Sequence, residues 1–209
     1  MSSKLGSLPS SQGKVCERLI RLARPEDGPA LAEIYRPAVT ENSTSFELEP
    51  PDGAEMARRV AKCMERTPWL VCERDGRVAG YAYGGMHRER AAYQWTAEVS
   101  AYVHQDFHRQ GIGRALYAAL VAALVAQGYR NAVAGITLPN DASVALHEAV
   151  GFTLVGVYRK VGYKFGAWHD VAWYERELAP RIIDPPAPRP LAECRDDPAF
   201  IAAVMRTPD

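Results

Sequence analysis

Apolar residues recur along the first part of the chain with the period of a strand and then with the period of a helix. Residues 18–23 alternate apolar and basic side chains, as a strand does, whereas the apolar residues between 31 and 38 fall on one face of a helix. Residues 52–66 repeat the helical spacing after the break at Pro50-Pro51. The chain is therefore predicted to begin with one strand followed by two helices.

Three strand-like runs follow these helices. Residues 69–73 and 77–83 flank Asp75-Gly76, a pair that is typical of a tight hairpin turn. Residues 93–103 continue with strand-like residues and extend the hairpin into a meander. The middle of the chain is therefore predicted to form three consecutive strands.

The next part alternates again between helix and strand. A stretch rich in Ala and Leu predicts a long helix that ends near Gly128, and a shorter helix is stopped by Gly151. In chain order these elements are a helix at 111–126, a strand at 131–136, a helix at 141–150 and strands at 152–161 and 168–178. The complete order, β-α-α-β-β-β-α-β-α-β-β, predicts an α/β fold of the α+β kind.

The two ends of the chain differ from the segment between them. Residues 1–16 are rich in Ser, Gly and Lys and are expected to form a flexible leader. Residues 17–179 are expected to form one domain, followed by a Pro-rich tail at 180–209 in which residues 198–205 could form a short helix. The chain is thus interpreted as a single domain with two appended ends.

Composition narrows the class of protein. The 209 residues are 47% hydrophobic, which suits one sizeable core, and the 25 basic residues balance the 25 acidic ones. A neutral chain has no global field for nucleic acid or an anionic membrane, and no apolar run is long enough to cross a bilayer. A cytoplasmic protein is expected. The four cysteines, which are far apart and interpreted as reduced thiols, are Cys16, Cys63, Cys72 and Cys194.

A glycine-containing loop precedes the long helix. Residues 104–116 carry Gly111 and Gly113 between a strand and the helix, with Arg109 and Arg114 beside them. Glycines let the backbone approach an anion, and the unpaired N–H groups of a helix start favour negative charge. By itself, a pair of glycines at the start of a helix indicates a tight turn about as often as a phosphate site. No Gly-Lys-Ser/Thr follows and the preceding strands form a meander, so neither a Walker loop nor a dinucleotide fingerprint is indicated.

The loop and the element order resemble the GCN5-related N-acetyltransferase (GNAT) superfamily over residues 18–178. In that superfamily, R/Q-x-x-G-x-G/A between a strand and a helix holds the pyrophosphate of coenzyme A; here His108 stands at the first position of the best frame, while Gln110 begins a second frame. Segments 92–98, 138–152 and 166–171 resemble the branch that acetylates phosphinothricin and methionine sulfone or sulfoximine. The resemblance implies the GNAT fold, a mixed central sheet flanked by helices.

The same resemblance implies how acetyl-CoA, the expected cosubstrate, is bound. Backbone groups of the strand before the loop would pair with pantetheine, rather like an added strand. Asn140 and Ser143 would touch the CoA arm, although they also suit the capping of the helix that they open. The full set of expected cosubstrate contacts is Ala101, Tyr102, Val103, His108, Arg109, Gln110, Gly111, Ile112, Gly113, Arg114, Asn140 and Ser143.

Two residues are candidates for catalysis. Glu98, among apolar neighbours on the predicted strand, would accept the proton of the attacking amine; the alternative is a solvated carboxylate in a surface salt bridge. His147 stands where the superfamily has a proton donor for the departing thiolate, although a lone His on a helix is more often structural. Tyr117 is a second candidate acid, and a Tyr at helical spacing is more often in the core.

Substrate contacts are implied at Phe46, Arg90 and Tyr93, with Arg88 as a weaker candidate, because guanidinium groups bind forked anions well. The alternative for Arg88 and Arg90 is a charged loop. The predicted function is direct acetyl transfer to a small amino-acid-like amine, by an enzyme that is expected to be a homodimer and to need no metal. The two rival functions are acetylation of proteins or peptides, and CoA sensing without turnover.

Overall fold

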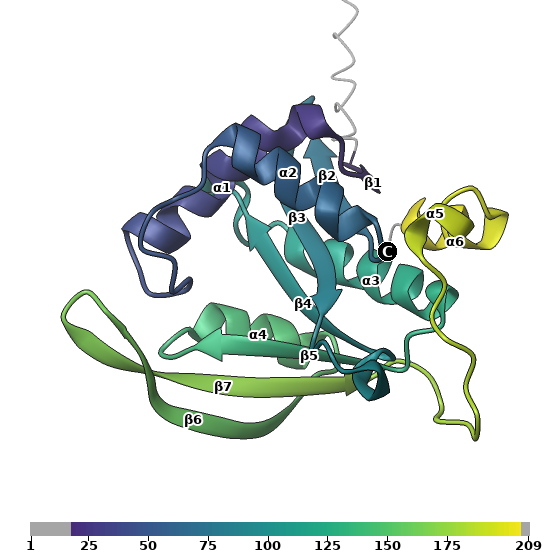
Figure 1. The fold of residues 1–209 in the computed structure, drawn as a ribbon. Coiled ribbons are helices and arrows are strands. Elements are labelled where there is room, and N and C mark those ends of the chain that lie inside the picture. The colour runs from purple at the N-terminus through teal and green to yellow at the C-terminus, as the bar shows by residue number, and fades with distance from the viewer. Residues whose placement is uncertain (1–17, 206–209) are drawn as a thin grey trace, which may run out of the picture.

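A mixed seven-stranded sheet runs through the structure, a computed structural model that describes residues 18–205 (Figure 1). The strand order is β1-β2-β3-β4-β5-β7-β6, and neighbouring strands are antiparallel except for β4 and β5. The strands are β1 (Arg18–Leu22), β2 (Trp69–Arg74), β3 (Arg77–Met86), β4 (Thr96–Val103), β5 (Asn131–Thr137), β6 (Thr153–Lys164) and β7 (Ala167–Glu177). This is the mixed sheet that the resemblance implied.

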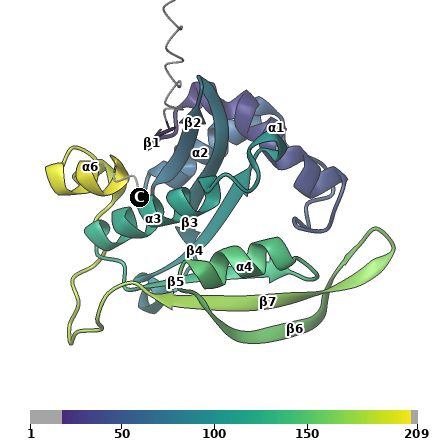
Figure 2. The same cartoon turned by 180° about the vertical axis from the view of Figure 1, so that it is seen from behind.

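Helices cover both faces of the sheet, and each face has its own core. Helices α1 (Gly28–Thr40) and α2 (Gly53–Met64) pack against one face, while α3 (Ile112–Gln127) and α4 (Asp141–Ala149) lie on the other (Figures 1 and 2). The core on the α3 side is mainly aliphatic, with a minority of Phe and Tyr rings. The other core contains a stack of aromatic rings, in which Trp69 lies 5.5 Å from Tyr81 and 4.1 Å from Tyr83, measured between ring centroids.

Helix α3 is the central helix because almost all of its surface is apolar. Small Ala residues alternate with Leu and Val, so the helix is buried on nearly every side between the sheet, α4 and the C-terminal segment. It begins after Gly111 and ends before Gly128, both of which have a positive φ that glycine adopts without strain. The sequence prediction of 111–126 therefore falls within one residue of both ends.

Several strands differ in length from their predictions. Strand β3 continues three residues beyond Tyr83, and β6 continues to Lys164. Residues 91–93, which include the predicted start of the third strand of the meander, form a short 3-10 helix before β4 begins at Thr96. Element ends depend on contacts with neighbouring segments, which periodicity along the chain does not report.

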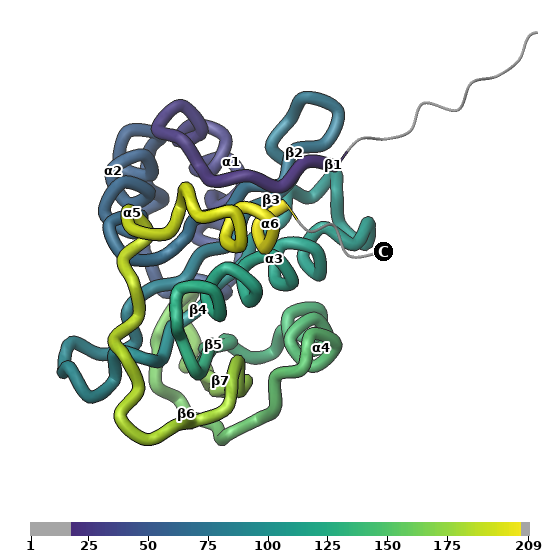
Figure 3. Tube along the Cα trace, turned by 90° about the vertical axis from the view of Figure 1, so that its right-hand side faces the viewer, coloured from purple at the N-terminus to yellow at the C-terminus, as the bar shows by residue number. Residues whose placement is uncertain are grey.

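The C-terminal segment is part of the core, and this corrects the expectation of an appended tail. Helix α6 (Pro198–Met205) has the bounds of the predicted short helix, and a further turn, α5 (Leu191–Cys194), precedes it. Both pack on α3, and α6 also contacts β1 (Figure 3). Their buried side chains are Leu191, Cys194, Phe200 and Val204.

Candidate active site

The central feature of the site is an opening in the sheet between β4 and β5. These parallel strands pair only from Thr96 to Glu98 and from Asn131 to Val133, although β4 continues to Val103 and β5 to Thr137. Beyond the last pair the two strands diverge (Figure 1). The cavity in this opening is lined by Thr44, Val99, Ser100, Ala101, Tyr102, Tyr117, Gly135, Ile136, Thr137, Asn140, Ser143 and His147.

The two candidate catalytic residues lie on opposite faces of the sheet. Successive side chains of β4 alternate between faces, so Ala97 and Val99 join the core beneath α3 while Tyr102 joins the core beneath α1 and α2. Glu98 shares the face of Tyr102, whereas His147 comes from α4 on the α3 side. A group held in the opening would therefore have a carboxylate on one side and an imidazole on the other.

Glu98 is the last residue of β4 to pair with β5, so it stands at the edge of the opening. Its side chain is 40% exposed, and Nδ1 of His87 lies 3.3 Å from its Oε2 atom. His87 is 16% exposed and follows the end of β3. Glu98 is thus accessible to a small molecule and is held from one side by an imidazole that the sequence analysis assigned no role.

His147 and Tyr117 form a buried pair. Nδ1 of His147 lies 2.7 Å from the carbonyl oxygen of Ser143, and its Nε2 lies 2.7 Å from the hydroxyl of Tyr117. Because a carbonyl only accepts hydrogen bonds, Nδ1 carries the proton, and Nε2 accepts from Tyr117 when the ring is neutral. Burial lowers the pKa of His147 and so favours the neutral ring, while the hydrogen bond to the Ser143 carbonyl acts in the opposite direction. Burial also raises the pKa of Tyr117, so its proton is retained.

The start of α3 provides the predicted anion site. The first turn of a helix leaves N–H groups without intrahelical partners, and Gly111, at the N-cap, offers no capping side chain. Arg109 and Gly111 have φ values of 58° and 76°, so the backbone folds back twice just before the helix. Successive turns of this kind make N–H groups converge, which suits phosphate oxygens.

Gly113 has a different role from Gly111. A Cβ atom at residue 113 would lie 2.9 Å from Cδ2 of Leu146, so the missing side chain lets α4 pack close to the start of α3. We expected both glycines to serve the anion. Gly113 therefore also lets α4, which carries His147, pack close to the loop, and its contact with the anion stays a prediction.

Side chains of the loop are partly engaged with the protein itself. Nε2 of His108 lies 3.0 Å from the carbonyl oxygen of Val103, and the Gln110 amide donates to the carbonyl of Asp106 and accepts from Arg74. These contacts brace the loop. Arg109 and Arg114 are exposed beside it.

Asn140 and Ser143 fulfil the capping role and also border the opening. Oδ1 of Asn140 accepts a hydrogen bond of 3.1 Å from the N–H of Ser143, as the N-cap of α4. Both residues line the cavity together with His147. Capping therefore does not exclude contact with a bound molecule.

The expected substrate residues do not form one cluster. Tyr93 lies edge-on to His87, with ring centroids 5.9 Å apart, and so stands near Glu98. Phe46 lies in the loop between α1 and α2 and packs against His169, while Arg88 and Arg90 are exposed in the turn before β4. Of these four residues, the structure places Tyr93 beside the candidate base.

A contact between distant segments encloses one side of the site. Lys164, at the end of β6, donates from Nζ to the carbonyl oxygen of Ser45 at 2.6 Å, and this ties the loop after α1 to the β6–β7 hairpin. Thr44, in the same loop, lines the cavity. This contact leaves no local signal in the sequence, because its partners are more than a hundred residues apart and the bond involves a backbone atom.

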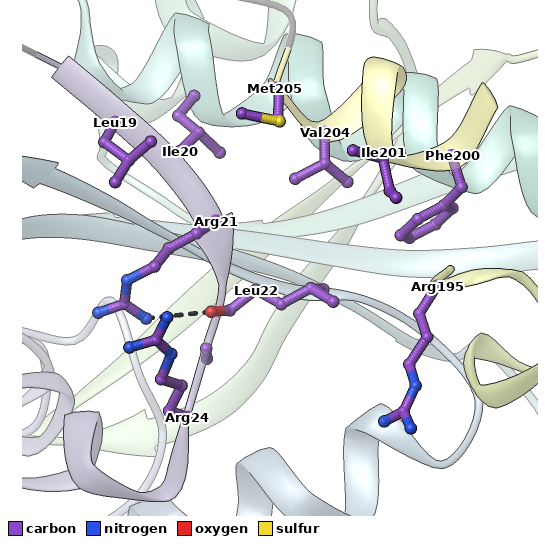
Figure 4. Close-up of a pocket in the computed structure, with 11 residues that line it drawn as sticks. Leu19, Ile20, Arg21, Leu22, Arg24, Arg195, Phe200, Ile201, Val204 and Met205 are labelled. Carbon is purple, nitrogen blue, oxygen red and sulfur yellow. Dashed lines mark hydrogen bonds between the residues drawn. The ribbon is translucent and has the colours of Figure 1, made fainter. Parts of the chain in front are cut away.

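A second cavity lies away from this site, at the β1 edge of the sheet. It is an apolar groove of about 280 Å³ between β1 and α6, lined by residues such as Leu19, Leu22, Phe200 and Val204 (Figure 4). The lining contains arginines, but it holds no carboxylate, imidazole or thiol that could act as a base or nucleophile. The groove therefore offers no candidate catalytic group.

Residues 18–205 contain neither a metal-binding cluster nor a membrane-spanning helix. Within this range, no three His, Cys, Asp or Glu side chains gather in a way that could hold a metal ion. None of the helices in the same range is both long and apolar enough to cross a bilayer.

Comparison with known proteins identifies the class to which this site belongs. Residues 20–173 match the family described as Acetyltransferase (GNAT) domain. The chain therefore belongs to the GNAT acetyltransferase family and is an acyltransferase. The matched range includes β4, β5, the anion loop and α4, which together form the site.

Individual relatives define a branch of the family. The chain is 41% identical to a phosphinothricin N-acetyltransferase of Streptomyces viridochromogenes, over 83% of this chain and 94% of the relative. It is 35% identical to an L-methionine sulfoximine/L-methionine sulfone acetyltransferase of Salmonella typhimurium, over 76% and 94%. A phosphinothricin acetyltransferase from Sinorhizobium meliloti, solved in complex with AcCoA, superposes with a TM-score of 0.77 at 35% identity, covering 81% of this chain and 93% of that one.

The anion loop can be tested with two glycines that share one conformation. Gly111 and Gly76 have φ values of 76° and 77°, so Gly111→Val and Gly76→Val should suffer similar backbone strain, roughly 1–2 kcal/mol. We expect only Gly111→Val to raise the KM for acetyl-CoA, by about tenfold or more, because it displaces charge-assisted hydrogen bonds. Steady-state kinetics on both folded variants checks this, and an unchanged KM in Gly111→Val would contradict the assignment.

Proposed function

We propose that this protein transfers the acetyl group of acetyl-CoA to the amine of a small amino-acid-like substrate of the phosphinothricin, methionine sulfone or methionine sulfoximine type. The observation that carries the proposal is the opening between β4 and β5, with Glu98 on one face and the Tyr117–His147 pair on the other. The names of the relatives, and the AcCoA bound in the Sinorhizobium structure, support the choice of substrates.

Acetyl-CoA fits this arrangement at two places. Main-chain N–H groups at residues 109–114 suit the pyrophosphate, and the exposed Arg109 and Arg114 add positive charge. Where β4 has left β5, backbone groups of residues 101–103 can pair with pantetheine as with another strand. Asn140 and Ser143 border the same cavity and complete the contacts.

The proposed reaction is a direct transfer. Glu98, whose side chain is 40% exposed, accepts a proton from the ammonium form of the substrate and releases it to solvent. The free amine then attacks the thioester carbonyl, the bond between carbon and sulfur breaks, and Glu98 accepts the second proton that the nitrogen loses as the amide forms. The Tyr117–His147 pair supplies the proton for the departing thiolate; the short hydrogen bond between the two side chains makes them one unit for this step. No covalent intermediate on the enzyme is required.

A small substrate is favoured over a peptide by the way the site is enclosed. The loop that carries Thr44 and Phe46 is fastened to the β6–β7 hairpin through Lys164, and Tyr93 stands on the side of Glu98. A peptide acceptor needs an open groove instead. Arg88 and Arg90 are exposed nearby in the chain, and we propose that they attract the substrate's carboxylate or phosphinate.

A substrate panel tests the function. Thiol release from acetyl-CoA is measured with phosphinothricin, methionine sulfone, methionine sulfoximine, ordinary L-amino acids and short peptides. We expect turnover with one or more of the free amino-acid-like amines and little with peptides. Faster turnover with peptides would favour the protein acetyltransferase function, and acetyl-CoA binding without any turnover would favour a sensor.

The general base is tested by Glu98→Gln, which keeps the size and hydrogen-bonding capacity of the side chain but removes its basicity. We expect kcat to fall roughly 10²–10⁴-fold with little change in acetyl-CoA binding. The acidic limb of the kcat/KM profile should move or vanish because Gln does not titrate. A folded variant with near-normal turnover and the same limb would make Glu98 a structural residue.

We further propose that the protein is a homodimer. Strand β6 is an edge of the sheet, and the β6–β7 hairpin exposes more than half of each of the apolar side chains Val155, Tyr158, Val161, Tyr163, Phe165 and Trp168. Of the two adjacent apolar residues of α6, Phe200 is buried and Ile201 is 42% exposed, so only Ile201 could add to such a surface. A cytoplasmic location is part of the same proposal.

Sedimentation at micromolar concentration tests the dimer. We expect the wild-type chain to sediment as a dimer and Trp168→Glu to shift it toward monomer, because a charge would be buried in the interface. Ile183→Glu is the control, since Ile183 is 92% exposed and lies outside the hairpin. A wild-type monomer would contradict the proposal.

A further inference from the structure

His87 lies where its ring can reach Glu98 without obstruction. In the ladder between β3 and β4, Gly85 is the direct partner of Glu98, and His87 is the next residue on the same face. Diagonal neighbours of this kind are within reach of a long side chain. Because Gly85 has no side chain, nothing on β3 stands between the imidazole and the carboxylate, and Nδ1 of His87 lies 3.3 Å from Oε2 of Glu98.

The imidazole is held in place by aromatic neighbours. Its centroid lies 5.9 Å from the ring of Tyr93 and 6.0 Å from the ring of Trp173, and it meets both edge-on, with interplanar angles of 77° and 70°. These rings come from the turn before β4 and from β7, so two separate segments hold the imidazole. Because the ring is already held in place, little side-chain conformational entropy is lost when its N–H donates to a partner.

Glu98 itself needs such a partner. Its side chain is 40% exposed and has several rotatable bonds, so without a contact it would sample many orientations. Within residues 18–205, His87 is the hydrogen-bonding partner that the structure gives to its carboxylate. The contact uses one oxygen, Oε2, and leaves Oε1 for another group.

We propose that His87 is a positioning residue for the transfer reaction: its Nδ1–H donates to Oε2 of Glu98 and directs Oε1 toward the substrate amine. The proposal rests on the proposed role of Glu98 as the base. In the reaction, the ammonium proton passes to Oε1 of Glu98, while His87 keeps its own proton throughout. His87 therefore acts on orientation and does not touch the substrate.

Two substitutions of His87 distinguish the effect of losing its hydrogen-bond donor from the effect of losing its ring packing. His87→Phe keeps a ring between Tyr93 and Trp173 but removes the donor, whereas His87→Asn places an amide N–H close to the position of Nδ1 and removes the ring. We expect kcat to fall about tenfold in His87→Phe, with the KM for acetyl-CoA unchanged, because one hydrogen bond to a charged group is lost. His87→Asn should recover most of this loss. Thermal unfolding of both variants confirms that they are folded.

A double-mutant cycle with Glu98→Gln decides whether His87 acts through Glu98. If it does, adding His87→Phe to Glu98→Gln should lower kcat no further, since the carboxylate to be oriented is already gone. A further tenfold loss in the double variant, or a wild-type kcat in His87→Phe alone, would overturn the proposal. Near-normal turnover in Glu98→Gln alone would instead overturn the general-base role, so the two failures are distinguishable.

Discussion

The separation of β4 from β5 after three residue pairs is the constraint on which the site depends. A parallel pair that continued to the end of both strands would close the sheet and leave no room between Glu98 and His147. Because pairing stops at Glu98, the backbone of β4 beyond this point is available to a bound molecule, and side chains on either face can reach the same space. The catalytic groups need not share an element or even a face of the sheet.

Other features of the fold keep this opening in shape. Gly113 allows α4 to approach the start of α3, and the Tyr117–His147 hydrogen bond joins the two helices again one turn further along α3. On the opposite face, the contact between Lys164 and Ser45 joins the loop after α1 to the β6–β7 hairpin. The predicted anion loop, the proposed proton donor and the enclosing loop are therefore positioned by packing between distant segments.

Local patterns in the sequence predicted most of the fold, whereas tertiary contacts decided most of the site. Helices α3 and α6 were predicted closely because their periodicity and capping residues are local signals. The packing of the tail was missed because its Pro-rich first half indicates a linker, although Phe200 and Val204, one helical turn apart, carried a signal for a buried face. His87 was assigned no role, because its contact with Glu98 depends on the register of β3 against β4, which composition does not reveal.

The fit between Phe46 and Gly162 links two segments that are far apart in the chain. A Cβ atom at residue 162 would lie 2.2 Å from the ring of Phe46, so the ring occupies the space that any side chain at residue 162 would need. The two positions are therefore mutationally coupled: a larger residue on β6 is tolerated only with a smaller one in the loop after α1. If one of these segments were exchanged between relatives, the matching residue of the other segment would have to be exchanged with it. The loop between α1 and α2 and the β6–β7 hairpin therefore form one exchangeable unit of the pocket wall.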